Sequence, residues 1–213
     1  MKWLTIFLFF ISVGGFAQPK VKVDTLIDFT RKDSLSLRRE LKIMQAVLDS
    51  PVFWELIIET NFYCRNQRRF HWGRNPFKSD YPIKKKDRHD YTNQEINDLI
   101  WNGDDEIGTP NDGIINLKLR AKHFEPNRNG TITHGSTNKN TLIISSSPTT
   151  RINNKTKGVY ACHLLHEYMH VLGFKHKSNH PTKNKKKCGG VDVVLGIQQI
   201  AIKTYKHILK QKK

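Results

Sequence analysis

The sequence predicts an α+β fold with a few short strands, a buried helix directly after them and further helices. Three features predict this class. Residues 114–147 contain short β-type segments separated by polar turns, which is typical of strands. Residues 159–172 are apolar around roughly half of a helical circumference, which is typical of a helix inside a core. Residues 33–50 carry apolar side chains at helical spacing, which predicts a packed helix ahead of the sheet.

Residues 1–17 have the organisation of a secretory signal peptide. Lys2 gives a positive start, an apolar run follows at residues 3–13, and small residues precede the Ala17–Gln18 bond. We expect cleavage at that bond and a chain that is secreted or periplasmic. The alternative, an uncleaved anchor, is disfavoured because the run is shorter than the roughly 20 residues that span a bilayer. We expect no transmembrane segment in the rest of the chain.

Residues 18–213 are predicted to form a single domain, since this length supports one hydrophobic core. Within it, residues 18–60 are interpreted as an N-terminal helical part or as a pro-like segment. The formal net charge is +17, which favours anionic surfaces as partners. Solvated loops explain the basic residues equally well, because most of them fall in loops and tails. We find no nucleic-acid motif, and we expect no specific nucleic-acid partner and a monomer.

The exported chain keeps three cysteines, Cys64, Cys162 and Cys188. In an oxidising compartment two of them are expected to form a disulfide. The sequence leaves all three pairings open, because spacing alone does not determine connectivity.

The first helix is predicted within residues 33–50. Ser50 followed by Pro51 fits an N-cap and the first turn of a new helix. The apolar residues 52–62 then predict a short helix or strand. Residues 63–90 are basic, aromatic and rich in turn residues, which predicts a loop.

A second capping signal stands at Thr92 and Glu95, whose spacing is that of a capping box and predicts a short helix to Trp101. Residues 102–113 follow as a loop and form the most acidic stretch. We expect a simple turn there, because the spacing does not fit an EF-hand. A Ca²⁺ ion is the weaker alternative, and its candidate ligands are Asp104, Asp105, Glu106, Asn111 and Asp112.

Three strands are predicted before the buried helix. In residues 114–124 four apolar side chains alternate with polar ones and are expected to face the core: Ile115, Leu117, Leu119 and Ala121. Residues 129–137 and 140–147 are two further short strands.

The buried helix at residues 159–172 carries a narrow polar stripe of His163, His166, Glu167 and His170. Buried imidazoles and a buried carboxylate are costly without partners, and a metal ion would remove that cost. His166 and His170 are four residues apart and share one face, so both can bind one Zn²⁺ ion. Glu167 can reach a water on that ion as a general base. His163 is expected to lie at the rim or to support the site.

A catalytic zinc ion needs a third ligand, and no glutamate follows His170 to provide it. Gly173 stands where the apolar periodicity stops, and glycine can adopt the left-handed conformation that turns the chain back. We therefore expect His176, three residues later, to complete the set. The remaining candidates would need long-range placement, and they are His180, Cys188, Asp192 and His207.

The segment HEYMHVLGFKH, residues 166–176, resembles the zinc signature of the metzincin metalloendopeptidases, and it matches at all five defined positions. The resemblance implies a zincin fold with a cleft. In it a small, mixed, mostly parallel sheet with an antiparallel edge strand packs on the active-site helix, and a C-terminal helix follows. It also implies an edge strand that holds an extended peptide, for which we prefer residues 129–137 over residues 140–147.

The chain departs from this family in one respect. Metzincins carry a methionine turn beneath the metal, and here no methionine follows Met169. An aliphatic side chain could serve the same packing role, and the candidates are Val193, Val194 and Leu195. A tyrosine contribution to the site is left open, because Tyr205 is the sole tyrosine downstream.

The function expected from the sequence is a secreted zinc-dependent endopeptidase that cleaves protein or peptide substrates. Its single catalytic Zn²⁺ ion would be held by His166, His170 and His176, with Glu167 as the general base. The alternative is a catalytically silent protein of the same fold that contains zinc or binds polyanions. A structural zinc would need a fourth ligand, for which Cys188 or His180 is a candidate.

Overall fold

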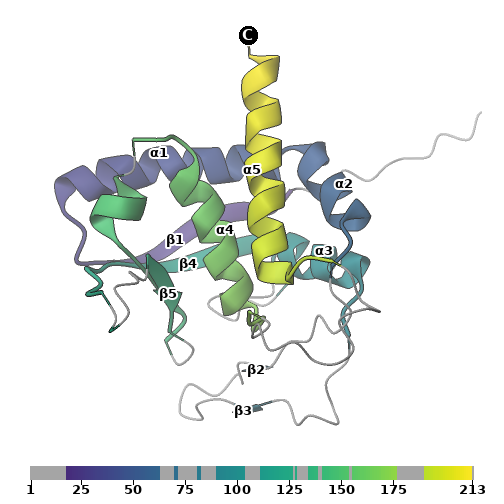
Figure 1. Cartoon of the computed structure of the whole chain (residues 1–213), viewed down its shortest axis with the longest axis horizontal. Helices are drawn as coiled ribbons and strands as arrows, with labels where there is room; N and C mark the ends of the chain where they lie inside the picture. The colour runs from purple at the N-terminus through teal and green to yellow at the C-terminus, as the bar shows by residue number, and fades with distance from the viewer. Residues whose placement is uncertain are drawn as a thin grey trace, which may run out of the picture.

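A computed structural model of the chain describes residues 18–62, 70–71, 81–82, 90–103, 111–126, 128, 134–138, 141–153, 155–176 and 190–212. Figure 1 shows the arrangement of the elements. In chain order they are β1 (Lys20–Ile27), α1 (Arg31–Leu48), α2 (Pro51–Glu59), β2 (Phe70–His71), β3 (Tyr81–Pro82), α3 (Asn93–Trp101), β4 (Ile114–Ala121), β5 (Gly135–Thr137), β6 (Ile143–Ser146), the π-helical turn η2 (Pro148–Ile152), α4 (Val159–Val171) and α5 (Val193–Gln211).

The main sheet has four strands in the order β1-β4-β6-β5. β4 runs parallel to both β1 and β6, whereas β5 runs antiparallel to β6 and forms an edge. This confirms the predicted mixed sheet with an antiparallel edge strand. This edge strand, Gly135–Thr137, lies inside the segment 129–137 that we preferred as the strand for an extended peptide. The predicted inward face of β4 is confirmed, since Ile115, Leu117 and Leu119 are fully buried.

The strand β1 was missed by the sequence analysis, which interpreted residues 18–60 as helical or pro-like. Its residues pair with β4 in parallel from Lys20 opposite Ile114 to Ile27 opposite Arg120. Val21 and Val23 pack against the core, and Lys22 and Asp24 are exposed. This period-two alternation is the local signal for the strand, and by itself it is a weak one.

The first helix starts two residues before the predicted segment 33–50, and its start signal was not predicted. α1 begins at Arg31 because Thr30 and Asp33 form a capping box, in which the Thr30 hydroxyl accepts from the Asp33 amide at 3.1 Å. The segment after Ser50 is a helix, which decides the open choice between helix and strand. The Ser50 side chain makes no capping hydrogen bond there, although Pro51 occupies the first turn as expected.

The remaining predictions for the first half of the chain have mixed outcomes. The Thr92–Glu95 capping box is confirmed, with the Thr92 amide donating to the Glu95 carboxylate at 2.7 Å. Residues 63–90 were predicted as a loop, and the part that the structure describes contains the two short antiparallel strands β2 and β3.

No helix within the described ranges is long and apolar enough to cross a membrane.

Helix α4 lies at the centre of the domain. It packs against α5, α1 and the β5–β6 edge of the sheet (Figure 1). Its apolar side is completely buried, including Tyr160, Leu164, Tyr168 and Met169. The helix boundaries match the prediction to within one residue. A polar stripe on so buried a helix must meet partners inside the protein, which sets the conditions for the site.

A buried carboxylate holds the first turn of α4. Glu40, on α1, is 1% exposed, and its two oxygens accept from the Gly158 amide at 3.3 Å and the Ala161 amide at 3.2 Å. Gly158 is the N-cap residue of α4 and has a φ of 83°, a conformation that favours glycine. Glu40 thus satisfies amides that have no partner within the helix and places negative charge at its positive end.

We expect Glu40→Ala to lower the free energy of unfolding by about 2–4 kcal/mol, because two buried amides lose their acceptor. Urea unfolding measures this difference. Glu55→Ala is the matched control, because Glu55 is exposed on α2, and it should change the free energy by less than about 0.5 kcal/mol. Equal effects of the two substitutions would contradict the capping role of Glu40.

Candidate metal site

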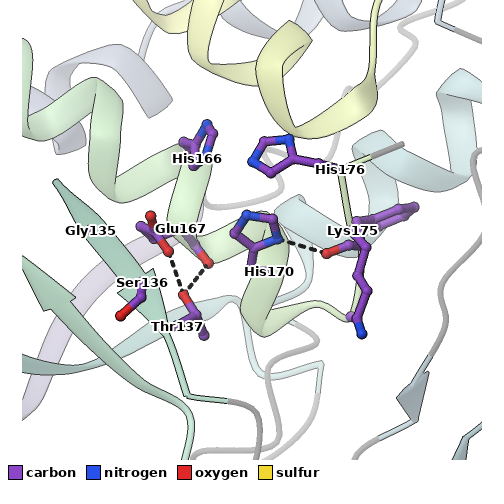
Figure 2. Close-up of a pocket in the computed structure, with 10 residues that line it drawn as sticks. Gly135, Ser136, Thr137, His166, Glu167, His170, Lys175 and His176 are labelled. Carbon is purple, nitrogen blue, oxygen red and sulfur yellow. Dashed lines mark hydrogen bonds between the residues drawn. The ribbon is translucent and has the colours of Figure 1, made fainter. Parts of the chain in front are cut away.

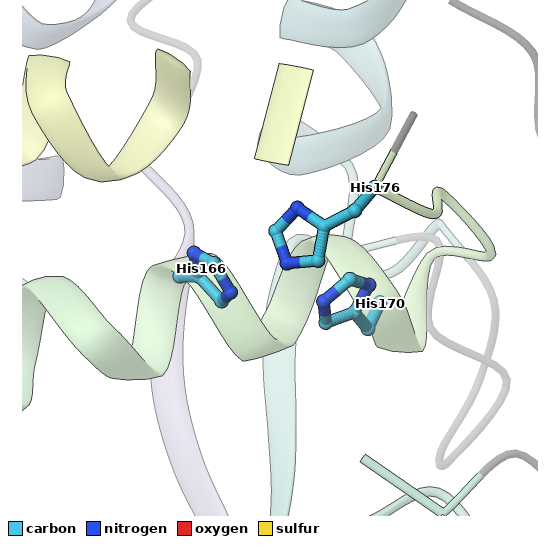
Figure 3. Close-up of side chains that lie close together, drawn as sticks. All are labelled: His166, His170 and His176. Atoms are coloured by element: carbon cyan, nitrogen blue, oxygen red, sulfur yellow. The ribbon is translucent and has the colours of Figure 1, made fainter. Parts of the chain in front are cut away.

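Three histidines converge at the C-terminal end of α4 (Figure 3). His166 and His170 are one turn apart on the helix, and His176 comes from the segment that follows it. The ring centroids are 5.3 Å apart for His166 and His170, 4.9 Å for His166 and His176, and 4.8 Å for His170 and His176. One ring nitrogen from each histidine lies within 4.8 Å of the other two, so the three can hold one metal ion.

The turn that brings His176 back is encoded at Gly173. Gly173 has a φ of 90°, its amide donates to the His170 carbonyl at 3.0 Å, and the Phe174 amide donates to the Met169 carbonyl at 3.0 Å. This pair of bonds is a Schellman motif, which reverses the chain at the end of a helix. Phe174 is 1% exposed and anchors the turn in the core. The predicted role of Gly173 is confirmed.

In His170 and His176 an acceptor contacts Nδ1 and orients the ring. His170 Nδ1 donates to the Phe174 carbonyl at 2.8 Å. His176 Nδ1 lies 3.4 Å from Asp192 Oδ1. When Nδ1 is engaged in this way, Nε2 is left free to bind a metal. This is the usual arrangement of metal-binding histidines.

The surroundings of His166, the third histidine, bear on whether a metal ion fits between the three rings. His166 Nδ1 is buried and meets no hydrogen-bond partner of good geometry among the described residues. The Gln198 side chain, on α5, contacts the ring and raises the pKa of His166 against the effect of burial. A buried polar atom of this kind usually meets an ion or a water molecule. Three imidazoles are also the ligand set of catalytic zinc sites that keep one open position. The three histidines can therefore hold one metal ion.

The charge state of the rings suits metal binding as well. Burial lowers the pKa of His166 to about 3, assisted by repulsion from His170 and His176. Burial also lowers the pKa of His170. Both rings are therefore neutral at pH 7, as a metal ligand must be. The pKa of His176 is instead raised, chiefly by its hydrogen bond with Asp192.

Glu167 is 3% exposed and points toward the edge strand β5 (Figure 2). The Thr137 hydroxyl, on β5, donates to Glu167 Oε2 at 2.7 Å and lies 3.2 Å from the Glu167 carbonyl. Burial raises the pKa of the Glu167 carboxyl, and the Thr137 hydrogen bond opposes that rise. A carboxylate with a raised pKa and a fixed orientation is suited to act as a general base.

His163 lies one turn before His166 and is 4% exposed, so of the two expected positions it takes the supporting one and not the rim. Its Nε2 is 3.3 Å from Ser146 Oγ and 3.8 Å from Glu167 Oε1. Gly135 makes this packing possible, because a Cβ atom there would lie 2.2 Å from His163 Nε2. His163 is not part of the histidine group, and it supports the Glu167 side of the site.

The three histidines of the candidate metal site and Glu167 line a cavity of 510 Å³. Its walls include the β5 residues 135–137, the three histidines and Glu167, and Phe174, Lys175 and Gly173 complete it. Figure 2 shows that Glu167 and the histidines lie beside β5. β5 pairs with β6 on one side, and within the described residues its other side has no strand partner. An extended peptide could therefore add to this edge next to the candidate metal position.

The other third-ligand candidates lie elsewhere. Asp192 is the N-cap residue of α5 and contacts His176 instead of joining the ligand group. His207, near the end of α5, is exposed and hydrogen-bonds with Gln211 at 2.8 Å. His180 and Cys188 fall outside the described residues.

The segment that we expected to replace the methionine turn is the start of a helix. Val193 and Val194 are buried in the first turn of α5, whereas Leu195 is 43% exposed and cannot serve as buried packing. Tyr205 packs on Gly158, at the opposite end of α4, where a Cβ atom would meet its ring at 2.4 Å. Since α4 rises about 1.5 Å per residue, Tyr205 lies too far from the histidines to contribute.

The structure also bears on the predictions for the acidic loop at residues 102–113 and for the cysteines. Asp112 Oδ1 accepts from the Ile114 amide at 2.8 Å, which is a simple turn of the kind expected there. Asn111, a second candidate calcium ligand, has a φ of 59°, and the remaining three, residues 104–106, lie outside the described part. Cys162 is a buried free thiol, and burial raises its pKa to about 12. Cys64 and Cys188 also fall outside the described residues, as does the predicted signal peptide at residues 1–17.

Three residues that complete the site were not predicted from the sequence. Thr137 and Gly135 lie on β5, and only the tertiary contact with α4 reveals their roles. Asp192 was considered only as a ligand, although its place before the apolar segment VVLG is an N-cap signal.

Comparisons of the chain with protein-family models, curated proteins and solved structures found no match.

Proposed function

We propose that the protein is an exported zinc-dependent endopeptidase of the metzincin type. The observation that carries the proposal is the convergence of His166, His170 and His176 beside a buried, oriented Glu167. The metzincin-like motif at residues 166–176 and the mixed sheet with its antiparallel edge support the same proposal. Export is proposed from the organisation of residues 1–17.

His166, His170 and His176 would hold the ion through one ring nitrogen each. A zinc ion in such a site supplies Lewis acidity toward a carbonyl and lowers the pKa of water to about 7. Glu167 then accepts a proton from the attacking water and passes it to the nitrogen of the leaving amine. Thr137 keeps the Glu167 carboxylate in place through its 2.7 Å hydrogen bond.

The substrate proposed for the site is a peptide in extended conformation. The unpartnered side of β5, within the described residues, offers backbone groups for pairing along the cavity. Because Thr137 belongs to that strand, the same element that would bind the peptide also holds the general base. Few other substrate classes would make use of an open strand edge next to a hydrolytic centre.

The proposal is tested with the mature chain, residues 18–213, stripped of metal with a chelator. We expect no cleavage of labelled casein or of a mixed peptide library, and cleavage restored by one equivalent of zinc. Zinc bound one to one without cleavage of either substrate would favour a catalytically silent protein. Failure to bind zinc would favour a polyanion-binding protein and contradict the metal site itself.

A further inference from the structure

Asp192 occupies a position with two distinct contacts. It is 8% exposed and forms the N-cap of α5, where its Oδ1 accepts from the Val194 amide at 3.1 Å and the Leu195 amide at 3.2 Å. The same oxygen faces His176 Nδ1 at 3.4 Å. One carboxylate therefore joins the start of α5 to the third candidate ligand.

Of the three histidines, His176 depends most on such a contact. His166 and His170 stand on a buried helix whose backbone fixes their direction. His176 follows the Gly173 turn, belongs to no helix or strand, and its side chain is 45% exposed. An imidazole in that setting can rotate, and rotation would take its Nε2 away from the other two rings. An acceptor at Nδ1 selects the productive orientation.

The residues just before Asp192 in the chain are fixed by backbone contacts with the segment after α2. The Val191 amide donates to the Asn61 carbonyl at 3.0 Å, and Val191 forms a parallel bridge with Phe62. The chain passes so close to this segment that a Cβ atom on Gly190 would lie 2.5 Å from the Asn61 carbonyl oxygen. The bridge on one side and α5 on the other fix Asp192 against the core.

We infer that Asp192 is a positioning residue for the metal site, orienting His176 so that its Nε2 faces His166 and His170. The inference rests on the metal site of the proposed function, but it does not depend on peptidase activity. It explains how the third ligand is supported in a chain that has no methionine after Met169. The support comes from a charged hydrogen bond at the start of α5.

Asp192→Ser separates the two roles of this residue, because serine caps a helix about as well as aspartate but lacks the carboxylate. We expect zinc affinity, measured by competition with a chromogenic chelator, to fall about 10–100-fold. The melting temperature of the zinc-free protein should stay close to that of the parent. Asp24→Ser, at an exposed position on β1, removes the same charge away from the site and should leave zinc affinity unchanged.

X-ray absorption at the zinc edge provides the second measurement. The parent should show three imidazole ligands, and Asp192→Ser should show fewer. Unchanged zinc affinity in Asp192→Ser would overturn the inference. A fall in affinity that only follows a lower melting temperature of the zinc-free protein would also overturn it, in favour of capping alone. Zinc binding by the parent without proteolysis would contradict the endopeptidase proposal and leave the role of Asp192 supported or refuted by these same measurements.

Discussion

Glu167→Gln is expected to reduce kcat/KM for peptide cleavage by about 10²–10⁴-fold, the usual contribution of a general base. The amide cannot accept a proton from water, so the step assigned to Glu167 is lost. Glutamine keeps an acceptor oxygen for the Thr137 hydroxyl, which now donates to Glu167 Oε2 at 2.7 Å. The fold and the three histidines should therefore be preserved.

The measurement combines single-substrate kinetics with zinc content. The variant should retain one zinc per chain, and its melting temperature should match that of the parent. Glu59→Gln is the matched control, because Glu59 is exposed on α2 and should leave kcat/KM unchanged. Cleavage by Glu167→Gln at the parental rate would show that another group takes the proton, and the proposed mechanism would be wrong.

The second large effect is expected from His170→Ala. In the parent, zinc at 1,000 times its Kd should raise the free energy of unfolding by about 4 kcal/mol, because the ion binds the folded state alone. His170 is one of the three proposed ligands, and its Nδ1 is fixed by the Phe174 carbonyl at 2.8 Å. Without it two imidazoles remain, and the zinc-dependent stabilisation should largely disappear.

Calorimetry with and without zinc measures this effect. His207→Ala is the control, since His207 is exposed on α5 and should leave the zinc-dependent stabilisation intact. A zinc-induced rise in melting temperature that is the same in His170→Ala as in the parent would place the ion elsewhere. Such a result would contradict the histidine site without any assay of proteolysis.

The parts of the fold that were predicted correctly are those with local causes. The Thr92–Glu95 capping box needs only residues three positions apart, and the buried face of β4 follows from its own alternation. The helix α4 could be predicted because its apolar surface is too broad for an exposed helix. In each case the signal lies within one turn or one strand.

The parts that were missed depend on partners far along the chain. The strand β1 is stabilised by β4, about ninety positions later in the sequence, and by itself its alternation is a weak signal. The sequence left His163 either at the rim or in a supporting position, because its burial depends on how closely β5 approaches at Gly135. No local pattern around either residue describes that approach.

The sequence by itself determined the group of candidate metal ligands, because His166, His170 and His176 lie within one helix end and the turn at Gly173. The geometry of a helix places the first two side chains on one face, and a left-handed glycine returns the third. Only the tertiary structure decided what surrounds that group: Thr137 on Glu167, and Asp192 on His176. These contacts come from a sheet edge and from the start of α5, and packing of separate elements alone brings such groups together.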